Sequence, residues 1–425
     1  MNQVLNRPVE GRAVKSRSAR NVWTFFMVMG PGLIVMEADN DAGAVSTYVQ
    51  AGAQYGTRLL WILLLLLPIT YFTQEMVVRL GIATGKGHAS MIYQRFGKWW
   101  GLFSLIDLQL VNFLTLVTEF AAISLALGKM GIDPRIAVPG SAIALIALVL
   151  SGSYLRWERT VIALCLFDLA WFVLAYRAHA PAAAILHDTF VPGVPGWNGA
   201  LMFLIIAIVG TTIAPWQLFF QQSCVADKRL RFADLKFARL DTFLGACFTI
   251  LIAGCMVTAG DAARRHGISF SDPAQMAVDL APVFGRVVRN AILLLMVNAA
   301  VLGTTAISLS SAWACGEARG WPHSLQLPLR EAKGFYAVYA GCVLLAASIV
   351  LIPRAPLQLI ILSVQVLAGL MLPSAIIFLQ LLLNDEEVLG KEFVNTRWNN
   401  RVNWTIIAVL FLLSLALAAQ VILGL

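Results

Sequence analysis

The chain is divided into apolar runs of about 20 residues, each long enough to cross a bilayer as a helix. Lipid offers the backbone no hydrogen bonds, so every peptide group in such a run must find its partner inside the protein. Of the 425 residues, 59% are hydrophobic and 13% are charged, whereas soluble domains have roughly 45–50% and 25%. The sequence therefore predicts an all-α integral membrane protein. About eleven spans are expected, at 22–54, 58–82, 100–128, 135–152, 159–177, 199–226, 240–260, 288–316, 335–353, 356–383 and 402–424.

Two of these spans are interrupted by polar or helix-breaking residues. The first contains Glu37 to Ala44 (EADNDAGA), and the sixth contains Gly210 to Gln217 (GTTIAPWQ). A carboxylate at mid-membrane costs about 2.5–3.5 kcal/mol, so acidic residues are expected there only where they face a cavity and meet a cation. Interrupted helices at corresponding places in two halves are typical of a transporter's substrate site.

The spacing of the interruptions predicts two five-helix repeats of opposite topology followed by one further helix. We expect a basic cytoplasmic tail at 1–21, a first repeat at 22–178 (helices 1–5), a second repeat at 199–384 (helices 6–10) and an eleventh helix at 402–425.

The distribution of basic residues predicts the orientation, because cytoplasmic loops retain Lys and Arg. With the amino terminus in the cytoplasm, most of the 31 basic residues fall inside, and an odd number of spans leaves the carboxyl terminus outside. Topology therefore accounts for the net charge of +8 without a nucleic-acid partner. The six cysteines have no CxxC spacing, so we expect free thiols rather than disulfides or zinc ligands. We expect a monomer without a cofactor, in a prokaryotic cell membrane.

Three segments carry a family resemblance. The first span has Gly30-Pro31-Gly32, Asp41-Ala42-Gly43-Ala44, and AGAQYG at 51–56 with Leu59-Leu60-Trp61. It resembles the first helix of the NRAMP divalent-metal transporters, whose patterns are GPG, DPGN and AGAxYGxxLLW. The sixth span (GTTIAPWQLFFQQ) and Gln365 with Pro373 in the tenth are similar to the family as well. The resemblance implies a LeuT-like fold with broken helices 1 and 6.

The chain also departs from the NRAMP pattern. Ala214 replaces a metal-binding methionine, Ala44 the asparagine of DPGN, and Trp216 a histidine. Leu116 stands at an acidic position, although Glu119 remains, and 335–352 lacks the expected arginines. These changes resemble the NRAMP-related magnesium transporters, which implies magnesium transport without proton coupling. Oxygen ligands suit hard cations, and Mg²⁺ keeps part of its water shell, so Ala214 and Ala44 would leave room for a partly hydrated ion.

The expected metal site combines charge, amide oxygen and unwound backbone. Asp41 and Thr211 match binding positions of the family, Thr211 through its carbonyl. Each candidate has a structural alternative: Asp41 can cap the second half-helix, Gln217 a helix end, and Gln365 can bond between helices. Asp39 can face a vestibule, Glu37 can act indirectly, and Trp216 can simply pack. The candidate residues are Asp41, Asp39, Thr211, Ala214, Gln217, Gln365, Ala44 and Glu37.

The sequence therefore favours a Mg²⁺ transporter that also accepts Mn²⁺, works by alternating access and is driven by membrane potential. A proton-coupled Mn²⁺ or Fe²⁺ transporter, a divalent-cation channel and a sodium-coupled symporter of organic solutes remain alternatives. An intramembrane enzyme is not expected, because the five histidines lie near loops and neither HExxH nor GxSxG occurs.

Overall fold

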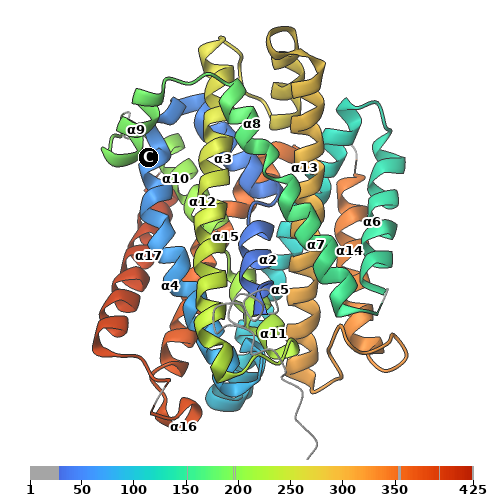
Figure 1. Ribbon diagram of the computed structural model, residues 1–425, viewed down its shortest axis with the longest axis vertical. Coiled ribbons are helices and arrows are strands. Elements are labelled where there is room, and N and C mark those ends of the chain that lie inside the picture. Colours follow the sequence, from blue (N-terminus) through green and yellow to red (C-terminus); the bar gives the residue numbers. More distant parts are fainter. Residues whose placement is uncertain are drawn as a thin grey trace, which may run out of the picture.

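The computed structural model describes residues 28–150, 152–194, 196, 198–352, 356–391 and 393–423, with side chains in the last helix to 416. The predicted tail at 1–21 lies outside this part. Within it, all regular structure is helical (Figure 1). The helices are α2 (Pro31–Ala38), α3 (Ala42–Tyr55), η1 (Gly56–Leu59), α4 (Leu60–Thr84), α5 (His88–Lys129), α6 (Pro134–Leu150), α7 (Tyr154–Phe167), α8 (Ala170–Arg177), α9 (Ala182–Phe190), α10 (Gly199–Thr212), α11 (Pro215–Asp227), η2 (Phe232–Asp234), α12 (Leu235–Arg265), α13 (Pro273–Arg319), α14 (Lys333–Val350), α15 (Leu357–Leu382), α16 (Glu386–Leu389) and α17 (Arg397–Leu423).

The apolar helices agree with the predicted membrane spans. Among the described residues, nine helical segments are long and apolar enough to cross a membrane. The first of them, Ala42–Thr84, joins two predicted spans, and Pro134–Leu150 is a shorter apolar helix. The exact count of eleven therefore stays a prediction.

Both predicted interruptions are present as breaks between half-helices. α2 ends at Ala38 and α3 begins at Ala42, with Asp41 in an extended conformation between them. α10 ends at Thr212 and α11 begins at Pro215, after extended Ile213 and Ala214. Proline suits the first position of a helix, because its missing N–H would have no helical partner there.

Small residues let the broken helices approach their neighbours closely. A Cβ on Gly210 of α10 would lie 2.5 Å from the Gly369 backbone nitrogen on α15. On the other side, a Cβ on Gly52 of α3 would lie 2.8 Å from the Asp261 nitrogen on α12. Such contacts favour tight packing of membrane helices, so each broken helix has a continuous one beside it.

Two long helices share an internal feature. α5 bends at Gly97 (φ 85°) and α13 bends at Gly285 (φ 88°), and both glycines follow a phenylalanine and precede a basic residue. α5 and α13 also pack against each other. α5 contains the third predicted span of the first repeat, and α13 contains the third predicted span of the second. The matching bends are therefore consistent with the internal repeat. The boundaries of the repeats stay a prediction.

Half-helix α2 is fixed at its amino-terminal end by side chains from other helices. The Asp241 carboxylate on α12 accepts hydrogen bonds from the backbone nitrogens of Gly32 (2.8 Å) and Gly30 (3.2 Å). Lys228 Nζ donates to the Met29 carbonyl (2.9 Å) and pairs with Glu158 (2.7 Å). An isolated helix of eight residues would be marginal in stability, so these contacts hold α2 in place.

We expect Asp241→Ala to destabilise the protein by about 1–3 kcal/mol, because buried backbone donors would lose their acceptor. Thermal unfolding in detergent measures this loss as a lower melting temperature. The control is Asp279→Ala on α13, where a partly buried carboxylate accepts from Gln275 one turn away. Equal melting temperatures for the two variants would contradict the prediction.

Candidate metal-ion site

The two helix breaks meet through a pair of buried side chains. The Asp39 carboxylate, which ends α2, accepts a hydrogen bond from the Gln217 amide in the first turn of α11. Gln217 in turn accepts from Gln74 Nε2 of α4 at 3.0 Å. Asp39 is 1% exposed and Gln217 is fully buried. The structure thus brings together two predicted site residues that are far apart in sequence.

Asp41 has the local role that its position predicts. Its Oδ1 accepts from the Ala44 nitrogen (2.8 Å) and so caps α3. A capping hydrogen bond uses only part of the acceptor capacity of a carboxylate. Asp41 therefore retains lone pairs for a second partner. Ala44 itself is buried in the first turn of α3.

Glu119 and Gly303 hold the start of α3. Glu119 Oε2 on α5 accepts from the Ala42 nitrogen at 3.1 Å. A Cβ on Gly303 of α13 would lie 2.8 Å both from Asp41 Cβ and from Glu119 Oε2. The structure thus shows Glu119 as the acceptor for a backbone donor at the first helix break. The absence of a side chain at Gly303 makes room for both acidic groups.

Several buried polar atoms around the breaks have no hydrogen-bond partner. Buried polar groups are normally paired with protein or water, so this concentration indicates a place for water or a cation. Gln365 of α15 reaches the first break, because its amide occupies the space that a side chain on Gly43 would need. The unpaired atoms are Asp39 Oδ2, Asn40 Oδ1 and Nδ2, Thr211 Oγ1 and Gln365 Nε2.

The other candidates are distributed around the same region. Thr211 and Ala214 lie on either side of the end of α10, both buried. Glu37 accepts instead from Thr249 of α12 at 3.1 Å. Trp216 is fully buried and meets Phe220 edge to face, the packing role that we weighed for it.

Asp168 is a buried acidic residue that our sequence analysis missed. It lies between α7 and α8 and is fully buried, and its Oδ1 accepts from Asn298 Nδ2 of α13 at 2.9 Å. It is the one charged residue between Thr160 and Tyr176. An ionisable residue inside a membrane span is itself a sign of function, so this signal was present in the sequence.

The groups at the breaks that could bind an ion do so through oxygen atoms. Within the described part of the chain, no three His, Cys, Asp or Glu side chains cluster as a ready metal site. An ion at the breaks would therefore combine one or two carboxylates with amide oxygens, backbone carbonyls and water. This set suits a hard cation better than a soft one.

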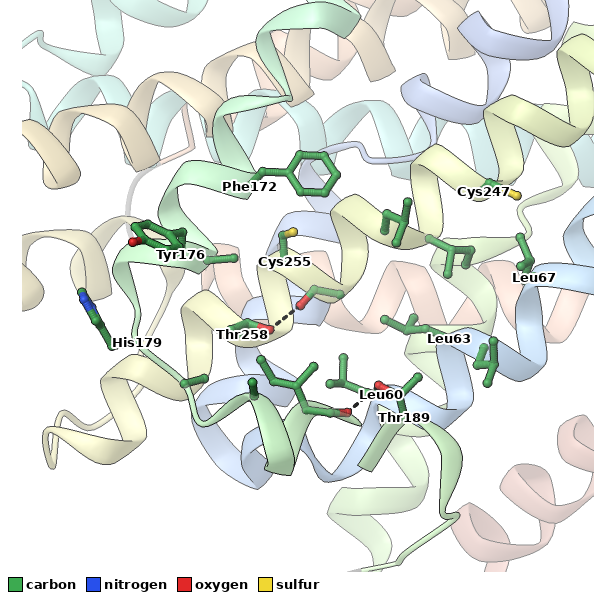
Figure 2. A pocket seen from close by; sticks show the side chains of 18 residues that line it. Leu60, Leu63, Leu67, Phe172, Tyr176, His179, Thr189, Cys247, Cys255 and Thr258 are labelled. Carbon is green, nitrogen blue, oxygen red and sulfur yellow. Dashed lines mark hydrogen bonds between the residues drawn. The ribbon is translucent and has the colours of Figure 1, made fainter. Parts of the chain in front are cut away.

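A separate cavity of about 830 Å³ lies between α4, α8, α9 and α12. Figure 2 shows Leu60, Leu63, Leu67 and Phe172 along its wall, with Cys255 and Thr258 from α12. Its lining includes no carboxylate. This cavity is therefore suited to apolar groups rather than to a cation.

Known proteins resemble the chain over almost its whole length. A profile of the family described as "Natural resistance-associated macrophage protein-like" (Nramp) matches residues 32–420. The divalent metal cation transporter MntH of Staphylococcus aureus is 25% identical, with 94% of this chain and 92% of the relative aligned.

Solved structures agree on the fold. A manganese transporter of Eremococcus coleocola superposes with a TM-score of 0.77 at 19% identity, over 96% of this chain and 90% of that one. MhsT in complex with L-phenylalanine gives a TM-score of 0.59 at 15% identity, over 91% and 98%. The predicted all-α, LeuT-like fold is confirmed.

We expect Gly303→Ala to weaken ion binding, because the added Cβ would press on Asp41 and Glu119. If the cost of overpacking, about 1–3 kcal/mol, falls on the ion-bound state, affinity drops by roughly 5- to 150-fold. Titration calorimetry of purified protein with Mn²⁺ measures the change.

The matched control is Gly341→Ala in α14, where an added Cβ meets open space. Its affinity should equal that of the wild type. If Gly303→Ala also binds with wild-type affinity, the ion does not depend on the arrangement of Asp41 and Glu119.

Proposed function

Because this chain belongs to the NRAMP family, we propose that it transports divalent cations, with Mg²⁺ as the main cargo and Mn²⁺ accepted as well. The observation that carries the proposal is the contact between Asp39 and Gln217 across the two helix breaks. It places a carboxylate and an amide beside unwound backbone in a buried region, where an ion can be bound and then released by alternating access.

The cargo class follows from the relatives, and the choice of Mg²⁺ follows from the ligands. The Staphylococcus aureus relative is named a divalent metal cation transporter, and the Eremococcus coleocola structure is a manganese transporter. At the breaks of this chain, Ala214 and Ala44 contribute neither sulfur nor amide. Mg²⁺ prefers oxygen and retains several waters, so short side chains at these positions favour it.

We assign Asp41 and Asp39 as the charged ligands. Asp39 Oδ2 is buried without a partner, and Gln217 contacts the other oxygen of the same carboxylate. The backbone carbonyl of Thr211 completes the site, together with water in the room that the short side chains of Ala214 and Ala44 leave. Both aspartates are at most 2% exposed, so neither carboxylate is open to solvent in this structure.

The membrane potential is a sufficient driving force for uptake. A divalent cation that moves inward through 100 mV gains about 4.6 kcal/mol, enough for roughly a thousandfold gradient at about 1.4 kcal/mol per decade. We propose transport without proton coupling, because Leu116 and Trp216 replace titratable residues of the family pattern.

We also propose the predicted orientation, with the end that carries α16 in the cytoplasm (Figure 1). Basic residues gather at this end in the connection between α11 and α12, at Lys228, Arg229 and Arg231. Cytoplasmic loops are enriched in such residues. The protein acts as a monomer in this proposal.

Uptake into proteoliposomes tests the function. With an inside-negative potential, we expect the wild type to take up Mg²⁺ and Mn²⁺ without a change in internal pH. Asp41→Ala should lose transport of both ions, because the site loses a charged ligand. Fluorescent metal and pH indicators inside the vesicles measure both quantities.

The control is Asp133→Ala, which removes an exposed carboxylate beside α6 and should leave transport unchanged. Impermeability of wild-type vesicles to Mg²⁺ would refute the proposed cargo. Acidification that accompanies Mn²⁺ uptake would select the proton-coupled alternative.

Ala214→Met tests the position of the site by restoring a thioether. A soft sulfur ligand favours softer ions, so we expect uptake to shift from Mg²⁺ towards Mn²⁺ and Cd²⁺. Competition assays in vesicles measure this ranking. The control is Ala226→Met near the end of α11, and an equal ranking in the two variants would place the ion away from Ala214.

A further inference from the structure

We propose a second divalent-cation site, formed by Glu37 and Asp168 with the Asn40 amide, on the side of half-helix α2 that faces α7, α8 and α12. It rests on the proposed function in one respect, that the bound ion is of the same class as the cargo. It assigns Glu37 to this second site rather than to the site at Asp41.

Glu37 supplies the first carboxylate. It lies in the last turn of α2 and is fully buried. Thr249 of α12 donates to its Oε1 at 3.1 Å and also to the Met36 carbonyl. The second oxygen, Oε2, has no hydrogen-bond partner. One oxygen is therefore fixed in place, and the other is free to bind an ion.

Asp168 supplies the second carboxylate. As in Glu37, one of its oxygens is hydrogen-bonded and the other is not. Asn298 of α13 donates to Oδ1 and, at 3.1 Å, to the Leu164 carbonyl, while Oδ2 is buried without a partner. Asp168 lies close enough to Glu37 for the two like charges to repel each other. Asp168 lies at the junction of α7 and α8, where the backbone stays right-handed helical, and α7 packs against α2.

Asn40 is the independent sign that something is bound here. Its amide nitrogen lies beside the Glu37 carboxylate, and its Oδ1 is buried without a hydrogen-bond partner. The side chain is 1% exposed. A buried amide oxygen without a partner is rare, and it adds to the unpaired oxygens of Glu37 and Asp168.

The charge of this group selects a divalent ion. Neither Glu37 nor Asp168 takes part in an ion pair with a described Lys, Arg or His. Two buried carboxylates without a basic partner require compensation. One divalent cation balances both charges, and three oxygen ligands with water suit a hard ion. Asp39 lies close enough to both Glu37 and Asp41 for like charges to repel, so it is near both sites.

Counting bound Mn²⁺ on the protein in lipid nanodiscs tests this inference. Equilibrium dialysis at saturating Mn²⁺, followed by elemental analysis, should give two ions per wild-type chain. Asp168→Asn and Glu37→Gln should each retain one ion, and Asp41→Ala should retain the other. The combination of Asp168→Asn with Asp41→Ala should bind none. Replacing sodium by choline in the buffer should leave every count unchanged.

The matched control is Asp107→Asn on α5, which removes a half-buried carboxylate held by Ser374 and should retain two ions. A wild-type count of one would overturn the inference without any variant, as would two ions in Asp168→Asn. Wild-type Mn²⁺ electron paramagnetic resonance gives a second reading: coupling between two ions supports the site, and isolated ions refute it.

The transport and ion-counting experiments distinguish failure of the proposed function from failure of the second site. If vesicles prove impermeable to Mg²⁺ while two Mn²⁺ ions are counted, the second site stands and the cargo is wrong. If transport requires Asp41 but wild type binds a single ion, the function stands and the second site is wrong.

Discussion

The burial of acidic residues without basic partners is the constraint on which this structure depends. Carboxylates near the ends of the helices have partners: Glu75 pairs with Arg79 and Arg239, Asp261 with Arg264 and Arg265, and Glu158 with Lys228. In the described part of the chain, the acidic residues at the helix breaks form no such pairs. Because an uncompensated charge in the membrane is expensive, the centre of the protein is built to receive positive charge from outside the chain.

The helix breaks are tolerated because neighbouring helices satisfy the exposed backbone. Glu119 accepts from the first nitrogen of α3, and Asp241 accepts from the nitrogens at the start of α2. Tyr48 and Thr212 bond at 2.7 Å and join α3 to α10. Non-helical backbone at membrane depth is possible only inside protein, so the close packing around α2 and α10 is a condition for the site rather than a separate feature.

The sequence predicted local features well and contacts between distant residues poorly. The break at Asp39 to Asp41, its capping by Asp41 and the break before Pro215 follow from residues that terminate helices, and a reader of the sequence can see them. The hydrogen bond between Gln217 and Asp39 spans 178 positions, and it depends on how two helices are rotated against each other. Composition and periodicity do not carry that information.

Asp168 was missed for a different reason. Our sequence analysis looked for charge at the two obvious interruptions, but the junction of α7 and α8 contains no Gly or Pro to reveal it. The only sign in the sequence was the charge of Asp168 within an apolar span. Glu37 was found, but its contact with Thr249 of α12 was not foreseen, because a place in a helix turn does not say which adjacent helix the side chain meets.

The proximity of Asp39 to two acidic groups has a consequence for release. A transporter must bind its ion tightly enough to remove it from water and loosely enough to let it go. If Asp39 is shared, a cation beside Asp41 and a cation beside Glu37 compete for the same negative charge and repel each other. Binding at one position then weakens binding at the other. The buried carboxylates that bind the ion would in this way also allow it to dissociate.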